Sequence, residues 1–331
     1  MAIHGRDTLD RQSAPFYANS AQIGEDEPDF YVSMLEQDVQ LGLMPIGGRV
    51  RKTGQPCARL LSGEQEAPSE LQNLIAAAMA TDRDSLSSAV SERANQTAAV
   101  AVAYGRATYE VGYYRLGAMP VGFVLLYLDP RLVAEDGGTF VQRIPRGTVL
   151  PGDTIQDAPR ELQEDELRVL DADRVLMVGW PPTYQKGPKW IRQLAWLGQE
   201  QFPSFLIENL TQPEKSRVPY DFEVVREAQD RAVASSTSAI GWNARGSFDR
   251  LQTSYYFCLR ELRFHRFKIM FRDHIVSCLN DAIARAGRAI GFNARVALDG
   301  LPALSDVSAA EKLLAAGKLS YKDLSDRFSL Y

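Results

Sequence analysis

The chain has 331 residues, 45% of them hydrophobic, and a formal net charge of −5 at pH 7. This length and apolar content suffice for one large domain or two ordinary ones with a buried core. The acidic balance excludes a protein that coats nucleic acid through a general positive field, so any contact with DNA must come from a local basic patch. The three cysteines are scattered and odd in number, which argues against a disulfide framework and for a reducing compartment.

The N-terminal third predicts a polar arm followed by helices. Residues 1–28 are polar and lack periodicity, so we expect an arm without a fold of its own. Helical spacing of apolar residues predicts a helix from Asp29 to Leu43, which the proline and glycines that follow would end. Short extended pieces are expected around 48–52 and 57–61, and then two helices within 69–105, separated by the polar break "TDRD".

The middle of the chain predicts strands. "RATYEVGYYR" and "VGFVLLYL" flank a turn, "EDGG" forms a second turn before "TFVQRIP", and "DRVLMVGW" reads as the last strand. We therefore expect a mixed sheet built largely from neighbouring hairpins. "DAD" at 171–173 precedes a strand and is interpreted as a turn, not as a cation site. The longest apolar run, 121–128, is too short to cross a bilayer, and the N-terminus lacks the apolar core of a signal peptide.

Helical spacing returns in the last 150 residues. After a helix near Trp190, an irregular link leads to a second helix that starts at Asp221 and that Gly241 can end. A helix from about Asp249 to Ala286 would be about 57 Å long at 1.5 Å per residue. An extended segment follows, and then two short helices, for which Ser308 with Glu311 and Ser320 with Asp323 fit the capping box.

Candidate chemical sites are few. "GGRVRKTG" at 47–54 places Lys52 after a glycine pair, but Arg51 stands where a phosphate-binding P-loop needs glycine. The cysteines and histidines at 258, 265, 274 and 278 fall on opposite faces of one helix and cannot converge on a metal. Since no hydrolase, metalloprotease or dinucleotide motif occurs either, we expect no catalytic residues, no metal, no cofactor and no enzyme.

A run at 250–272 mixes basic and aromatic residues. Such a mixture suits nucleic acid, through phosphate contact and base stacking. It equally suits an amphipathic helix with buried aromatics and outward arginines, which we favour for most of these positions. The possible basic face comprises Arg260, Arg263, Arg266 and Lys268.

The loop before this run joins two helical stretches. Gly241 and Gly246 permit a chain reversal, and Trp242 can anchor one end of the loop by burial. Arg245 and Arg250 belong to the loop and not to the middle of a helix. The candidate site residues in this loop are Asn243, Arg245, Ser247 and Arg250.

The order of these elements resembles the phage portal protein family, including its Mu-like branch. "DEPDFYVSMLEQDVQLGLMPIGGRV" is similar to the opening helix and first strand of portals, and "AAVAVAYGRATYEVGYYR" to their helix that passes through a glycine into a strand with a central glutamate, here Glu110. "RVLDADRVLMVGWPPTY" resembles the strand that ends the wing sheet. "DFEVVREAQDRAVASSTSAIGW" resembles the second stem helix, "NARGSFDRLQ" the tunnel loop, "ELRFHRFKIMFRDHIVSCLNDAIA" the long helix behind it, and "AAEKLLAAGKLSYKDLSDRF" the late helix pair.

The resemblance implies an α+β, portal-like fold with a mixed β wing sheet, stem helices and one very long helix. The implied divisions are an arm (1–28), a wing-like α/β region (29–185), stem helices (186–240) with a short clip-like link (202–219), a tunnel-like loop (241–252), a long helix (253–292), and a C-terminal strand with two short helices as a reduced crown (293–331). The link is shorter than the usual clip, and no long crown follows.

For function, the resemblance implies a non-enzymatic structural subunit of a ring, usually of twelve copies, at a capsid vertex. Double-stranded DNA would pass through the ring during packaging and ejection. The implied partners are further copies of the chain, the major capsid protein, the terminase large subunit and neck or adaptor proteins. The implied location is the virion, reached from the host cytoplasm during assembly, without a membrane. Two alternatives stay open: another phage head–tail or DNA-binding structural protein that uses the 250–272 face, and an enzyme with a dispersed site.

Overall fold

The computed structural model describes residues 30–79, 85–116, 119–136, 138–150, 160–186, 240–242 and 254–328. Its helices are α1 (Phe30–Gly42), α2 (Ser69–Ala78), α3 (Leu86–Tyr104), α6 (Ser254–Ile290), α7 (Leu304–Ala315) and α8 (Tyr321–Phe328). Its strands are β1 (Ala58–Ser62), β2 (Gln65–Glu66), β3 (Arg106–Leu116), β4 (Met119–Leu128), β5 (Val133–Asp136), β6 (Thr139–Ile144), β7 (Val149–Leu150), β8 (Arg160–Glu161), β9 (Glu166–Leu170), β10 (Val175–Gly179) and β11 (Arg295–Leu298). The α+β class and the very long helix are as predicted.

The strands form small sheets and not the single mixed sheet that we expected. The strand orders are β11–β1–β2, β10–β3–β4, β5–β6–β9 and β7–β8, and every pairing among the described strands is antiparallel. The hairpins were correctly located because their turns are local. The division into separate sheets was not predicted, because it depends on which distant strand lies beside each hairpin.

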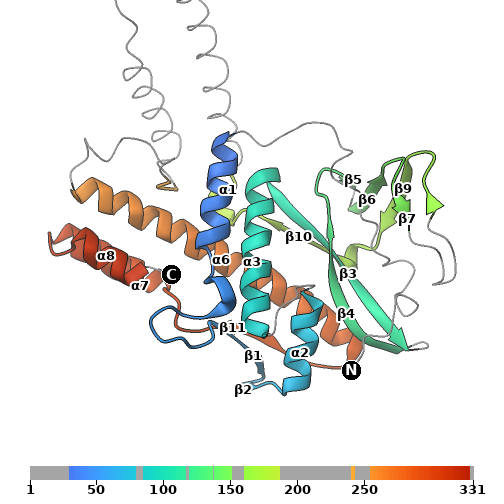
Figure 1. The fold of residues 1–331 in the computed structure, drawn as a ribbon, viewed down its shortest axis with the longest axis horizontal. Helices are drawn as coiled ribbons and strands as arrows, with labels where there is room; N and C mark the ends of the chain where they lie inside the picture. Colours follow the sequence, from blue (N-terminus) through green and yellow to red (C-terminus); the bar gives the residue numbers. More distant parts are fainter. Residues whose placement is uncertain are drawn as a thin grey trace, which may run out of the picture.

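Helix α3 is the centre of the fold (Figure 1), with α1, α2, α6 and strands of two sheets packed around it. Thirteen of its 19 residues are buried, most of them alanine, serine or other small residues, so neighbouring backbones can approach closely. The helix ends at Gly105, which has a left-handed φ of 82°, and β3 begins at the next residue. The predicted passage from helix through glycine into strand is therefore confirmed.

Helix α6 has 37 residues and is about 55 Å long at 1.5 Å per residue. From about Phe264 onward it packs in the main core, through residues such as Phe267, Phe271 and Leu279. Its N-terminal half also packs against α7 and α8, which lie beside it (Figure 1). The second hydrophobic cluster that joins these three helices consists of Cys258, Leu262, Ile269, Val307, Ala310, Leu314, Leu324 and Phe328.

The chain after α6 returns to the first sheet. β11 pairs antiparallel with β1, with Val296 opposite Leu60. The Asn280 side chain of α6 fixes this strand, because its Oδ1 accepts the Val296 N–H at 2.7 Å and its Nδ2 donates to the Val296 carbonyl at 3.0 Å. The extended segment after the long helix was predicted, but its pairing with a strand more than 230 residues earlier was not.

The two C-terminal helices differ in how well their starts were predicted. At α8, Asp323 donates its N–H to Ser320 Oγ and its carboxylate accepts the Ser320 N–H, which confirms that capping box. At α7 the prediction was wrong, because the helix begins at Leu304 and Ser308 lies inside it. There Asp306 accepts the Ala303 N–H at 2.7 Å, and this carboxylate satisfies a donor at the helix start without a serine at the N-cap.

Several predicted parts of the chain lie outside the described residues. These are the arm at 1–28, the helices and the clip-like link within 187–239, and residues 243–253 of the tunnel-like loop and its junction with α6. At 48–52 the expected strand is reduced to an isolated bridge between Arg49 and Pro56 followed by turns.

Candidate functional site

The chain segment 240–242 lies directly against the N-terminal half of α6. A Cβ added to Gly241 would lie 2.3 Å from the Arg260 carbonyl oxygen, 2.6 Å from the Arg263 Cβ and 2.7 Å from the Phe264 nitrogen. Gly241 also has a φ of 73°, in the left-handed region that glycine adopts without strain. Both the backbone conformation and the close approach therefore require glycine here, as the predicted chain reversal implies.

Trp242 anchors this segment, as predicted. Its side chain is 1% exposed and belongs to the main core. Its indole Nε1 donates a hydrogen bond of 2.9 Å to Asp38 Oδ2 on α1. Burial removes the apolar indole ring from water, and the hydrogen bond to Asp38 satisfies its N–H donor. The segment 240–242 is thus held against α6 at Gly241 and to α1 through Trp242.

The four predicted loop residues, Asn243, Arg245, Ser247 and Arg250, lie outside the described residues. Their neighbours in sequence are fixed at both ends, by Trp242 in the core and by α6 from Ser254 onward. Since Gly241 contacts α6 at Arg260–Phe264, the segment 243–253 joins a point some two turns along α6 to the start of that helix. The role of these four residues stays a prediction.

The four residues of the possible basic face of α6 lie in different environments. Arg263 is exposed, whereas Arg266 donates to Glu311 Oε2 of α7 in an ion pair of 2.6 Å. The Arg260 guanidinium lies 5.3 Å from the centre of the Phe257 ring. Lys268 Nζ lies 4.8 Å from the centre of the Phe264 ring, and burial lowers the pKa of Lys268. Much of this positive charge is therefore engaged within the protein.

The aromatic residues of α6 follow the amphipathic pattern along most of the helix. Phe267 and Phe271 are fully buried and pack against Trp180, with ring centres 5.4 and 5.8 Å apart. Tyr255 and Tyr256, in the first turn, are 47% and 61% exposed. This burial accounts for the aromatic side chains from Phe264 onward without a nucleic-acid partner.

His265 of α6 faces α8. Its ring stacks on Phe328, with ring centres 4.7 Å apart and an interplanar angle of 21°. Burial, with a smaller contribution from the charge of Lys268, lowers the pKa of His265 to about 3. The imidazole is therefore neutral near pH 7 and serves as a packing group of the α6–α8 contact.

Two of the three cysteines, Cys258 and Cys278, lie on α6. His274 Nε2 lies 3.9 Å from Cys278 Sγ, and burial raises the pKa of Cys278 to about 11. Cys258 is buried in the second cluster and its pKa is also raised by burial. No group of three or more potential ligands with a suitable arrangement occurs among the described residues. In the described part of the chain, no helix is both long and apolar enough to cross a bilayer.

A buried ion pair joins two of the sheets. Glu110 of β3 is 2% exposed, and its Oε1 lies 2.8 Å from Arg168 Nη2 of β9. The resemblance pointed to Glu110 as a central glutamate, but nothing in the sequence pattern indicated Arg168 as its partner. The two residues are 58 positions apart in sequence, and most of the residues of β9 around Arg168 are exposed.

Comparisons with known proteins give limited similarity. No protein-family model matches the chain, and no curated protein matches it. Among solved structures, one matching chain comes from the virion of a native gene transfer agent particle. It shares 12% sequence identity and a TM-score of 0.42, over 95% of this chain and 98% of that chain. A similarity of this degree does not identify a function.

Proposed function

We propose that this protein is the structural subunit of a phage portal ring. In this role, copies of the chain form a ring at one capsid vertex, and double-stranded DNA passes through the ring during packaging and ejection. The ring is also the docking site for the packaging motor and for the neck or tail. The subunit has no enzymatic role in this proposal.

The observation that carries the proposal is the arrangement around α6. A 37-residue helix follows the segment 243–253, and the chain just before that segment lies against the same helix at Gly241 and is bonded to α1 through Trp242. This arrangement suits a short loop held on a stiff support, which can shift without unfolding either neighbour. The element order around it, from α1 through α3, Gly105 and β3 to α7 and α8, is the order on which the resemblance to portals rests.

The charge distribution supports sliding and not gripping of DNA. The chain has a net charge of −5, and Arg266 is paired with Glu311 within the subunit. Each phosphate that a protein neutralises adds salt-dependent affinity, which would retard translocation. A mostly acidic channel with few local cations therefore suits a passage for DNA.

The proposed partners follow from this role. They are other copies of the chain in a ring, with twelve as the expected number, the major capsid protein, the terminase large subunit and neck or adaptor proteins. The proposed location is the virion, at the capsid vertex, after assembly in the host cytoplasm.

Deletion of residues 243–247 tests the proposal in particle assembly. Because Trp242 and α6 stay intact, we expect the deletion variant to form rings and procapsids but to package much less DNA than the unchanged chain. Circular dichroism and thermal melting of the 243–247 variant control for general damage to the fold. Normal packaging by the 243–247 variant would contradict the proposed channel role, and failed ring assembly would assign the loop a packing role instead.

A further inference from the structure

A groove of about 460 Å³ lies between the loop that follows α1 and the C-terminal helices. Its walls include Pro45, Val50, Leu301 and Pro302, and its charged side chains are Arg51, Lys52, Asp306 and Arg327. Arg51, Lys52 and Arg327 are exposed. The groove thus combines an apolar floor with three cationic side chains and one carboxylate, from parts of the chain more than 240 residues apart.

The loop that carries Arg51 and Lys52 is closed by its own hydrogen bonds. Val50 N–H donates to the Gln55 carbonyl at 2.9 Å and Gly54 N–H to the Val50 carbonyl at 2.7 Å. Arg49 Nη1 donates to the Gly54 carbonyl at 2.9 Å. The loop is therefore ordered before any ligand arrives, which lowers the entropic cost of binding.

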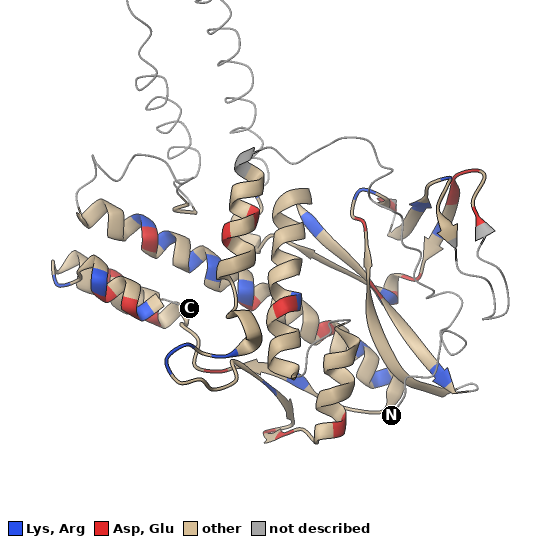
Figure 2. Ribbon diagram, in the orientation of Figure 1, with Lys and Arg blue, Asp and Glu red and all other residues tan. Residues whose placement is uncertain are grey.

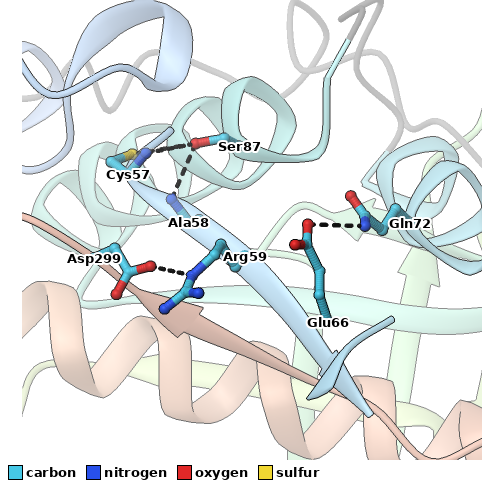
Figure 3. A network of polar contacts seen from close by, with 7 residues as sticks. All are labelled: Cys57, Ala58, Arg59, Glu66, Gln72, Ser87 and Asp299. Atoms are coloured by element: carbon cyan, nitrogen blue, oxygen red, sulfur yellow. Dashed lines mark hydrogen bonds and ion pairs between the residues drawn. The ribbon is translucent and has the colours of Figure 1, made fainter. Parts of the chain in front are cut away.

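The base of the loop is held by Ser87 of α3, as Figure 3 shows. Ser87 Oγ accepts the N–H groups of Cys57 and Ala58, both at 3.0 Å, and donates to the Gly48 carbonyl at 2.6 Å. A Cβ at Gly48 would lie 2.4 Å from the Ser87 carbonyl carbon, so the backbone of the loop packs directly against the backbone of α3 at this point. The buried core thus fixes where Arg51 and Lys52 are presented.

The other wall of the groove is fixed by a contact across it. Lys52 Nζ donates to the backbone carbonyl of Asp326 on α8. An ammonium group has three donors, so this contact leaves Lys52 able to donate to a ligand as well. Arg327 is the next residue of α8, and Figure 2 shows the basic loop beside the C-terminal helices.

The single carboxylate of the groove is already engaged. Asp306 Oδ2 accepts the Ala303 N–H at the start of α7. Its charge is therefore partly compensated by the helix N-terminus, where carboxylates are stabilised. The cations consequently outweigh the acid, and two of them are arginines, whose planar donors match phosphate oxygens.

We propose that this groove binds a phosphoryl group through Arg51, Lys52 and Arg327. The group comes either from the backbone of duplex DNA or from a small phosphorylated molecule, and both present the same anionic oxygens. The groove is not a P-loop, since turns and β1 follow Lys52 where a P-loop requires a helix. The inference goes beyond the proposed function, because it holds for a ring subunit and for a monomer alike.

The test compares paired variants of the full chain. Arg51→Ala/Lys52→Ala and Arg51→Ala/Arg327→Ala each remove two groove cations, and the second leaves the Lys52 contact with α8 intact. Arg288→Ala/Arg295→Ala removes two exposed cations that do not line the groove, with the same change in net charge. Circular dichroism and thermal melting establish that each variant is folded.

Binding is measured with a fluorescent 20-base-pair duplex at several salt concentrations, and separately with inorganic phosphate by calorimetry. If DNA is the source, each groove variant binds the duplex more weakly. The magnitude of the negative slope of log K against log salt then decreases by about 2, or about one per lost phosphate contact, while the control keeps its slope. If a small molecule is the source, only phosphate binding is lost in the groove variants. The proposal is overturned if neither ligand distinguishes the groove variants from the control.

Discussion

Trp242 and Asp38 are joined by a hydrogen bond of 2.9 Å between the indole Nε1 and the carboxylate Oδ2. The bond links the end of the segment 240–242 to α1, across 204 positions of sequence. In the proposed ring subunit, this contact fixes the chain at one end of the tunnel-like loop to α1.

Replacing Trp242 by alanine should strongly destabilise the fold. The side chain is 1% exposed, and removing a large buried aromatic group costs about 3–5 kcal/mol of unfolding free energy. Trp242→Phe keeps most of the apolar contact but loses the donor to Asp38, so its cost should be about 1–3 kcal/mol. Urea denaturation measures both variants. Equal stability of Trp242→Ala and the unchanged chain would contradict the anchoring role.

Gly241→Ala should be more damaging than Gly63→Ala. Both glycines have a left-handed φ, 73° and 66°, but nothing lies within 4 Å of a Cβ at Gly63. Gly63→Ala should therefore cost only the backbone term of about 1–2 kcal/mol. Gly241→Ala adds a clash with the α6 backbone at Arg260. Thermal melting of the two variants measures the difference, and similar melting temperatures would show that the segment is not held against α6.

Arg168→Ala should cost about 3–5 kcal/mol of unfolding free energy, because it leaves the buried Glu110 carboxylate without this charge partner. Arg143→Ala is the matched control: Arg143 pairs with Asp165 at 2.7 Å, but both side chains are well exposed. Its cost should be about 0–1 kcal/mol. Chemical denaturation of the two variants compares them, and equal costs would contradict a structural role for the Glu110–Arg168 pair.

Stability should fall as the pH is lowered below about 6.5, because of His265. The folded state holds this imidazole neutral down to a pKa of about 3, whereas the unfolded chain takes up a proton near its ordinary pKa. The unfolded state thus binds more protons in this range, and stability decreases by up to about 1.4 kcal/mol per pH unit for one proton. His265→Phe keeps a ring against Phe328 and should lose this part of the pH dependence. An unchanged slope in that variant would rule out His265 as the source.

The sequence could predict the local features of the fold. Turn residues gave the hairpins, helical spacing gave α1, α2, α3 and the long α6, and Gly105 and Trp242 were read correctly from their types and positions. The sites built from distant residues could not be predicted in this way. The pairing of Glu110 with Arg168 depends on how the strands pack on one another. The groove that Lys52 and Arg327 line depends on how the C-terminal helices return to the core. The start of α7 was predicted wrongly because the Asp306 carboxylate, and not a serine side chain, accepts the Ala303 N–H there.

The mass of the assembly that the chain forms tests the portal proposal most directly. Two preparations of the full chain are compared, one expressed alone and one isolated from complete phage particles. Each is measured by mass photometry and imaged by negative-stain electron microscopy. A portal subunit predicts closed rings with a central channel, of about 440 kDa for twelve chains of 36.8 kDa each. Only monomers and dimers in both preparations, with no ring at any concentration, would contradict the proposal.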